Sequence, residues 1–420
     1  MALSADTRPH FGTVAQFVSS MGNQIISIFR DVVAVCYSEG LIGKRMFAID
    51  GCKISSNCAK EWSGTKKELQ KKAEKLEQSM RMLVQRHRQE DEREEKSSER
   101  EREKRTIQTL EAKAKKIQSW LAQSGERIGT QGKPVKSNIT DNESAKMPSS
   151  HGVIQGYNGI ATVDDKHQVV VDAQAFGEGH EAQNLTRVLE SVQSTLVALG
   201  EKSDGLHEVV LTADSGFHSE ASVGALLDGG MDAYIADTRF RQRDARFAGV
   251  QEYKKKGTDR HKTSIARKYF RSEDFAIDEA SGELVCPAGK RLRRCATFRS
   301  KGYRGISYIA DGASCKECTL RGRCIRKPNT PARQVTKLER GMREDKKSNT
   351  QKMIERFDSP RGRSFYRRRM GTVEPVFANI RACLGLDRFT LRGRKKVDIQ
   401  WKLFCLVHNI GKIHTFGLAN

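Results

Sequence analysis

Short apolar runs alternate with helical patterns between residues 152 and 237, and this alternation constrains the fold more than any other feature. Residues 152–176 alternate apolar and polar positions around Asp164 and Asp165, which is typical of adjacent β-strands. A helical repeat follows over residues 181–199, and its apolar face carries Leu185, Val188, Leu189, Val192 and Leu196. A strand ending at Asp214, a helix over 219–230 and a strand over 232–237 come next. Alternating strands and helices predict an α/β core.

Both ends of the chain add elements to this core. Residues 11–45 carry apolar side chains at helical spacing, and the run MFAID then predicts a buried strand that ends at Asp50. The C-terminal region shows two further helical patterns, over 370–383 and near 401–410. In the first of these, Val373, Val376 and Phe377 surround Glu374, so we expect the helix face that bears Glu374 to point inward.

A charged segment separates the first strand from the rest of the core. From Lys66 to Arg105, 25 of 40 residues are charged, 14 basic and 11 acidic, while leucines recur every seven residues from Leu69. An apolar pattern resumes from Ile107 to Leu121, which favours an antiparallel coiled-coil hairpin with Trp62 and Trp120 packed at its base. A solvated charged helix explains the middle of the segment equally well. The charges nearly cancel, so a spacing or self-association role is expected.

The charge balance points to a polyanionic partner. The chain has a net charge of +23 and a pI near 9.7, and from Arg321 to Lys396 there are 23 basic against 7 acidic residues, a balance of +16. Such a concentration indicates nucleic acid or an anionic membrane surface. Mean hydropathy is −0.63, with no run of about 18 apolar residues and no signal-peptide order at the N-terminus. We therefore predict a cytoplasmic protein with no membrane partner.

Ten cysteines in a chain of 420 residues are better explained by thiols or a metal site in a reducing compartment than by disulfides. Four of them have spacing suited to a structural zinc site: Cys286, Cys315, Cys318 and Cys324. Cys295 is left over. Reduced thiols in a small subdomain explain the same pattern equally well. Residues 240–350, which contain these cysteines, are basic and irregular.

Two carboxylates follow apolar runs, and each is followed closely by glycine. Asp50 precedes Gly51, and Asp214 precedes Gly216. If the two strands lie side by side, the carboxylates meet and repel unless a cation neutralises them, and hard oxygen ligands suit Mg²⁺ or Mn²⁺. Taken singly, an Asp at a strand end is more often a turn former, and a Glu among apolar residues on a helix often pairs with Arg. Periodicity alone does not join Asp50, Asp214 and Glu374.

Six ordered blocks from about residue 8 to the C-terminus resemble bacterial insertion-sequence transposases of the group whose third acidic block reads VEPVF. They are FAIDGCKISSN, NESAKM with GVIQGYNGIATVDDKHQVVVDAQA, TADSGFHSE, CPAGK, ERFDSPRGRSFYRRRMGTVEPVF and RFTLRGRKKVDIQWKLFCLVHNI. The resemblance implies a ribonuclease H-like core with a DDE triad. Motif by motif, the triad falls on Asp50, Asp214 and Glu374.

The resemblance implies DNA cleavage at the ends of the element and joining of the freed 3′-hydroxyl to target DNA. Two Mg²⁺ or Mn²⁺ ions roughly 3.5–4 Å apart serve such in-line displacements. We expect Asp50 to bridge the ions and Asp214 and Glu374 to hold one each. The implied partner is double-stranded DNA, both element ends and target, bound by a homodimer or higher assembly.

Accessory residues follow from a Tyr–Arg–Glu–Lys signature of related transposases, which Tyr366, Arg369 and Glu374 resemble. The spacing from Arg to Glu is one residue longer here, and Arg381 stands in the Lys place. Arg367 or Arg368 is therefore an alternative phosphate ligand. The basic run from Arg361 to Arg369 is the expected phosphate-contacting surface.

These features predict six regions, listed here in chain order. They are a partial N-terminal helical region (1–45), the first strand or strands of the core (46–62), the coiled-coil insertion (63–127), the continued core (128–240), a basic cysteine-containing insertion (241–350) and the C-terminal helices of the core (351–420). The chain begins close to its first matching block, whereas relatives carry a longer helical start. A catalytically inactive, truncated, transposase-derived DNA-binding protein is therefore the alternative, and a coiled-coil scaffold is a third reading that leaves both aspartates unexplained.

Overall fold

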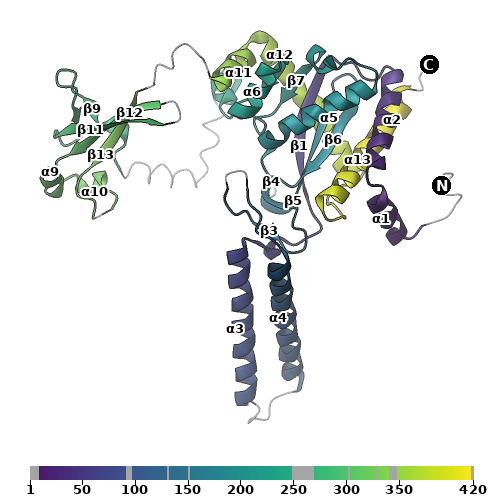
Figure 1. The fold of residues 1–420 in the computed structure, drawn as a ribbon, viewed down its shortest axis with the longest axis horizontal. Coiled ribbons are helices and arrows are strands. Elements are labelled where there is room, and N and C mark those ends of the chain that lie inside the picture. The colour runs from purple at the N-terminus through teal and green to yellow at the C-terminus, as the bar shows by residue number, and fades with distance from the viewer. Residues whose placement is uncertain are drawn as a thin grey trace. The chain divides into compact units, whose positions relative to one another are not determined.

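The computed structural model describes residues 9–90, 97–129, 132–149, 152–247, 269–300, 303–327, 329–339 and 348–417 (Figure 1). The chain forms two compact units. The first joins Met1–Asp237 to Asn349–Asn420, and the second is Thr238–Ser348. Helices and several sheets occur together, so the predicted α/β class is confirmed.

A six-stranded mixed sheet lies at the centre of the first unit, with the order β4-β5-β1-β7-β8 and with β6 paired to β5. Its strands are β1 (Met46–Ser55), β4 (Ala145–Ser149), β5 (Gly152–Asp164), β6 (Val170–Phe176), β7 (Val210–Ala213) and β8 (Ala233–Ile235). β5 runs antiparallel to β1, β4 and β6, whereas β1, β7 and β8 are parallel. The predicted strand pair around Asp164 is confirmed as β5 and β6.

β1 is twice as long as the apolar run that predicted it, and it continues through Asp50 to Ser55. The expectation that the strand ends at Asp50 is wrong. Cys52 and Ile54 are buried, and the strand stays paired with β5 from Phe47 to Ser55. The Asp50–Gly51 dipeptide resembles a turn signal, but pairing with β5 keeps it extended.

Helices cover both faces of this sheet. α12 (Pro360–Ala378) and α13 (Arg394–Lys412) pack on one face, where the Trp401 ring lies against the open backbone of Gly159. The preceding residue, Asn158, projects to the opposite face and donates a hydrogen bond to Glu181. Glu181 begins the 3₁₀ turn η3 (Glu181–Asn184), which leads into α5 (Leu185–Ala198) on that face.

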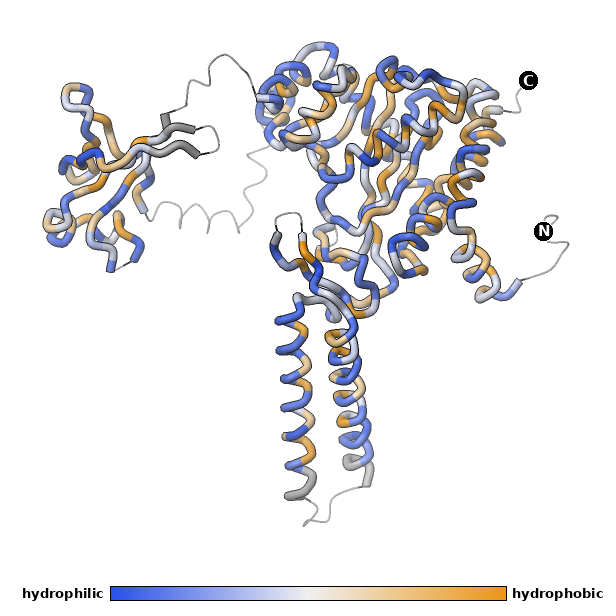
Figure 2. Tube along the Cα trace, in the orientation of Figure 1, coloured by the Kyte–Doolittle hydropathy of each residue, from blue (hydrophilic) through white to orange (hydrophobic). Residues whose placement is uncertain are grey.

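The predicted N-terminal helical region forms α1 (Phe11–Ser20) and α2 (Gln24–Ser38). α2 packs against α13 through the buried side chains Ile25, Phe29, Val33 and Cys36. Two further helices of the unit are α6 (Glu220–Asp228) and α11 (Asn349–Asp358). Figure 2 shows hydrophobic strands in the interior of this unit.

The charged segment forms α3 (Lys66–Glu90) and α4 (Ser97–Gln123), which pack on each other. They run antiparallel, because Glu77 contacts Gln118 near the base and Arg86 contacts Glu103 further out. Leu69, Ala73 and Ile117 form a buried cluster at the base, with Trp62 and Trp120 packed against it. The predicted position of both tryptophans is confirmed, and the connection at residues 91–96 lies outside the described residues.

The second unit contains a five-stranded antiparallel sheet of order β13-β12-β11-β10-β9, where the sequence reading expected irregular structure. Its strands are β9 (Ala276–Ile277), β10 (Leu284–Val285), β11 (Arg291–Ser300), β12 (Tyr303–Ala310) and β13 (Gln334–Glu339). Phe275, Leu284, Leu292, Tyr308 and Val335 form its core. Two short helices accompany the sheet, α9 (Gly312–Lys316) and α10 (Arg321–Cys324). Across the described parts of both units, no helix has the length and apolarity needed to cross a membrane.

Candidate active site

Asp50 and Asp214 lie beside each other on neighbouring parallel strands. β1 and β7 pair in register up to Ile49 and Ala213, so the next residue on each strand is one of the two aspartates. β7 ends there while β1 continues, which leaves Asp214 half-buried in the following loop. Burial raises the pKa of the Asp50 carboxyl, and the charge of Asp214 raises it further. The structure therefore brings together these two predicted site residues.

A guanidinium group contacts the Asp50 carboxylate. Arg369 of α12 donates a hydrogen bond from Nη1 to Asp50 Oδ2 at 2.6 Å, and both side chains are largely buried. This positive charge opposes the rise in the pKa of Asp50. The Arg369 guanidinium lies 5.4 Å from the Tyr366 ring centroid, and burial raises the pKa of the Tyr366 hydroxyl. Arg369 and Tyr366, predicted as accessory residues, thus lie next to the carboxylate pair.

Glu374 lies on α12, but its side chain is exposed while Val373, Val376 and Phe377 are buried. The expectation that Glu374 points inward is wrong. The apolar side chains of α12 pack against the sheet, and Glu374 lies at the exposed edge of that apolar face. Glu374 is near enough to raise the pKa of the Cys52 thiol. Cys52 and Asp50 are two residues apart on β1 and project from the same face. Glu374 therefore lies on the Asp50 face of the sheet.

Arg381 also reaches this face. It belongs to the π-turn Asn379–Cys383 that continues α12, and its positive charge opposes the rise in the pKa of the Cys52 thiol. Burial nevertheless raises the pKa of Cys52 to about 11, so the thiol stays neutral near pH 7. Two basic side chains, Arg369 and Arg381, thus lie next to β1 on the face that bears Asp50.

A third carboxylate, which the sequence reading missed, approaches Asp50 and Asp214. Glu181 is buried in the turn before α5, and burial raises its pKa to about 7. The charges of Asp214 and Asp50 both contribute to this rise, and that of Lys53 opposes it. Lys53 Nζ lies 3.9 Å from Glu181 Oε1. The only sequence signal was an acidic residue in the polar stretch GEGHE before a helix, which is unremarkable by itself.

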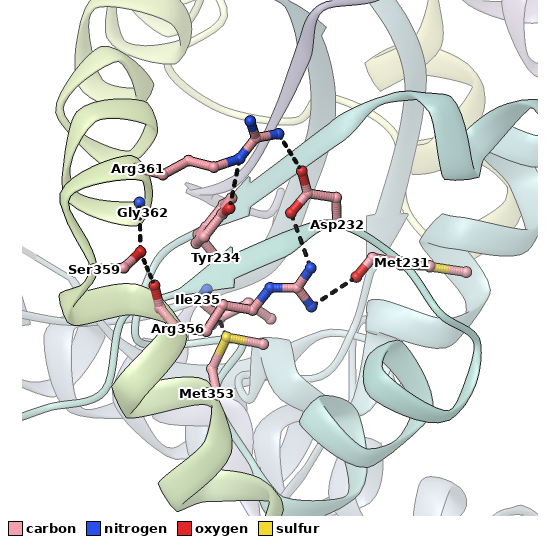
Figure 3. A network of polar contacts seen from close by, with 9 residues as sticks. All are labelled: Met231, Asp232, Tyr234, Ile235, Met353, Arg356, Ser359, Arg361 and Gly362. Carbon is pink, nitrogen blue, oxygen red and sulfur yellow. Dashed lines mark hydrogen bonds and ion pairs between the residues drawn. The ribbon is translucent and has the colours of Figure 1, made fainter.

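The basic run Arg361–Arg369 lies on α12, and several of its arginines are bound within the unit. Arg361 donates to Asp232 Oδ2 at 2.7 Å and to the Tyr234 hydroxyl at 3.0 Å, and Arg356 donates to the other oxygen of Asp232 (Figure 3). Arg363 pairs with Asp358, and Arg368 pairs with Asp165 at 3.3 Å. Arg367 is exposed, and among the described residues no ion pair is seen for it.

The same network anchors α11 and α12 to the sheet edge. The Met353 sulfur accepts a hydrogen bond from Ile235 N at 3.4 Å, and Arg356 Nη1 donates to Met231 O at 3.1 Å (Figure 3). Ser359 caps α12 by accepting from Gly362 N. These contacts fix the position of the helix that carries Tyr366, Arg369 and Glu374.

In the second unit, Cys286, Cys315, Cys318 and Cys324 line one cavity of about 40 Å³. Cys286 sits in a tight turn in which Lys290 N donates to its Sγ at 3.3 Å and Gly289 adopts a φ of +74°. Burial raises the pKa of the Cys324 thiol. The charge of Arg333 lowers this pKa, and the other three thiols raise it further. Cys295 is exposed on β11 and donates to Ser307 O. The structure therefore gathers the four predicted cysteines and leaves Cys295 apart.

A divalent cation fits the donor chemistry of the carboxylate site. Asp50, Asp214 and Glu181 repel one another, and the described cations that touch them are Arg369 and Lys53. Asn158 is fully buried beside Glu181, and its Oδ1 has no hydrogen-bond partner within the described structure. In the described residues no three His, Cys, Asp or Glu side chains already stand at metal-binding spacing. Arg369 holds the position on Asp50 that a cation would share.

Comparison with known proteins gives a match to a family model. Residues 285–414 match the family model of the transposase DDE domain. The matched segment is about a third of the chain and contains Glu374, the arginines of α12 and the four cysteines, whereas Asp50 and Asp214 precede it. The match supports a DDE transposase. No curated protein and no solved structure matches the chain.

Proposed function

We propose that this chain is a transposase that cuts DNA at the ends of an insertion sequence and joins the freed 3′-hydroxyl to target DNA. The observation that carries the proposal is the register of β1 and β7, which places Asp50 against Asp214. The family match over residues 285–414 supports it independently, since that segment supplies Glu374. The core is ribonuclease H-like in this proposal, and α3 with α4 is its coiled-coil insertion.

Asp50, Asp214 and Glu374 would hold two Mg²⁺ or Mn²⁺ ions. When bound, the ions supply Lewis acidity for an in-line phosphodiester displacement. Asp50 lies at the centre of the sheet, next to Asp214 and on the face where Glu374 lies, which suits it to bridge the two ions. Arg369 and Arg381 flank β1 on that face and would neutralise phosphate oxygens of bound DNA.

Double-stranded DNA is the proposed partner, both element ends and target, with a homodimer or higher assembly on it. Arg367 is the strongest phosphate contact of the basic run, because it is exposed and its charge is not paired by the described acids. Arg361, Arg363 and Arg368 are bound to acids of the same unit. Their first role is to hold α12.

The test is nicking of a supercoiled plasmid that carries the DNA flanking this gene on both sides. We expect Mn²⁺-dependent nicking that is lost in Asp214→Asn and kept in the control Asp204→Asn, whose side chain is exposed before β7. Nicking that survives Asp214→Asn would overturn the mechanism. DNA binding without Mn²⁺-dependent nicking in the unmodified chain would instead establish the inactive DNA-binding protein.

We also propose that Cys286, Cys315, Cys318 and Cys324 hold a structural Zn²⁺ ion. The thiols line one cavity, and Lys290, Arg291, Arg321 and Arg333 line it too. Four thiolates around Zn²⁺ carry two net negative charges, which these basic side chains would offset, and a Lys290 N–H already points at the Cys286 sulfur.

Zinc content by mass spectrometry tests this on the full chain purified without added chelator. We expect one Zn²⁺ per chain, lost in Cys318→Ser and kept in the control Cys295→Ser. Co²⁺ substitution should give the strong visible absorption of tetrahedral thiolate coordination. Equal zinc content in both variants, or none in the unmodified chain, would refute the site.

A further inference from the structure

Glu181 occupies a space that two glycines leave open. A Cβ atom on Gly51 would lie 2.9 Å from Glu181 Oε1, and one on Gly216 would overlap Glu181 Oε2. That Cβ atom on Gly216 would also lie 3.0 Å from Asp214 Oδ1. The Glu181 and Asp214 carboxylates therefore flank one point at the end of β7, and only residues without a side chain permit that approach.

Glu181 reaches this point from the face of the sheet opposite to Asp50. The Glu181 side of the sheet bears the side chains of Lys53 and Asn158, and a Cβ on Gly51 would point there too. The side chains of Asp50 and Cys52 project towards α12 on the other face. Beyond Ala213 the strand β7 has ended, and the charge of Asp214 acts both on Asp50 and on Glu181. Asp214 can thus share a ligand with Asp50 on one side and with Glu181 on the other.

The partners of Glu181 leave its charge incompletely satisfied. Asn158 Nδ2 donates to Oε1 at 3.1 Å, and Lys53 Nζ is 3.9 Å away, too far for a hydrogen bond. Asn158 itself is fully buried with an unpartnered Oδ1 directed at the Gly51 backbone, 2.7 Å from where a Cβ would stand. If Glu181 were only half of a structural ion pair, we would expect Lys53 Nζ within hydrogen-bonding distance of Glu181 and a donor for Asn158 Oδ1. A bound cation would instead neutralise the Glu181 carboxylate and could accept Asn158 Oδ1 as a ligand.

We propose that Glu181 is a fourth carboxylate ligand of the metal site and that it binds the cation held by Asp214. This inference rests on the proposed function, because it assigns Glu181 to the same two-metal centre. The centre would then draw its ligands from β1, the turn before α5, the end of β7 and α12. Carboxylate oxygens from both faces of the sheet would enclose the ion near Asp214, which gives it more protein ligands than the triad alone supplies.

Mn²⁺ binding to the full chain without DNA tests the inference without reference to activity. Titration followed by the electron paramagnetic resonance of free Mn²⁺ gives stoichiometry and affinity. We expect Glu181→Gln to weaken the affinity of one site by about tenfold or more, and Asp214→Asn to weaken it further. The matched control is Glu190→Gln, an exposed glutamate on α5, which should bind Mn²⁺ as the unmodified chain does.

The outcomes separate this inference from the function on which it rests. If Glu181→Gln binds Mn²⁺ normally while Asp214→Asn does not, Glu181 is not a ligand and the two-metal function stands. If neither variant changes Mn²⁺ binding, both proposals fail. Glu181→Asp should restore part of the affinity, since it keeps the carboxylate on a shorter side chain, whereas a structural role for Glu181 predicts no difference between the Gln and Asp variants in Mn²⁺ affinity.

Discussion

Arg369 Nη1 donates a 2.6 Å hydrogen bond to Asp50 Oδ2, so an arginine neutralises the central carboxylate of the proposed metal site in the absence of a cation. Removing one member of a buried ion pair leaves the other charge uncompensated, which costs about 3 kcal/mol or more. We therefore predict that Arg369→Ala lowers the free energy of unfolding by roughly that amount in metal-free buffer. Urea unfolding followed by circular dichroism measures it.

The same variant should regain stability when Mn²⁺ is added, because a ligand that binds the folded chain alone stabilises it. The unmodified chain should gain less, since its Arg369 competes for Asp50. An identical Mn²⁺ response in the two proteins would show that Arg369 and the cation do not share the Asp50 carboxylate.

Gly216→Ala should mimic the loss of Glu181, because the new methyl group would overlap Glu181 Oε2 and displace that side chain. The end of the Glu181 side chain can rotate away, so we expect a folded protein with Mn²⁺ affinity weakened about as much as in Glu181→Gln. The control is Gly205→Ala, where a Cβ would meet Glu201 Cβ at an ordinary 3.4 Å. Normal Mn²⁺ binding by Gly216→Ala would argue against a close approach of Glu181.

Arg367→Gln should weaken binding to DNA of any sequence and reduce the slope of log affinity against log salt by about one, as expected for one lost phosphate contact. Fluorescence anisotropy with a labelled duplex at several salt concentrations gives both quantities. Arg361→Gln is the comparison, because Arg361 already binds Asp232 and Tyr234. It should change the salt slope less and the unfolding free energy more. The reverse ranking would assign the phosphate contact to Arg361.

His408 should make the fold sensitive to mild acid. Its ring lies between Asn379 Nδ2 and Gln168 O, at 2.8 and 3.0 Å, and burial lowers its pKa below the usual 6.5. The folded chain therefore resists protonation that the unfolded chain accepts, so this contribution is complete above pH 6.5 and is lost as pH falls towards the folded pKa. Between pH 7.5 and pH 5.5 the free energy of unfolding should fall less in His408→Gln than in the unmodified chain, by up to about 1 kcal/mol. Parallel pH profiles for the two proteins would contradict it.

Sequence reasoning located Asp214 at the end of a strand but gave no sign of Glu181 beside it, for physical reasons. Asp214 ends a short, wholly apolar run, and the pairing of that run with the MFAID segment follows from their common strand character. Glu181 lies in a turn with no periodic pattern, and it enters the site only because Gly51 and Gly216 lack side chains. A side chain that reaches a site through the absence of other side chains leaves no local signal.

The second unit was misread for a related reason. β11 has the sequence RLRRCATFRS, in which the buried Leu292 is surrounded by arginines and the alternation typical of a strand is hidden. Its strands form through pairing with β10 and β12 around the small core of Phe275, Leu284 and Tyr308. Long-range pairing of this kind outweighs local propensity.

Buried apolar contacts between α3 and α4 lie at the base of the hairpin. There Trp62 and Trp120 pack against the cluster of Leu69, Ala73 and Ile117. Further out, apolar side chains such as Leu83, Ile107 and Leu110 are only half-buried. The pair of Arg86 with Glu103 lies there too, and such exposed pairs add little stability. The length of the hairpin is thus decoupled from the folding of the sheet at its root. Lineages could add or remove whole helical turns there and so retune the reach of the arm, about 5.4 Å at a step, while the carboxylate centre stays the same.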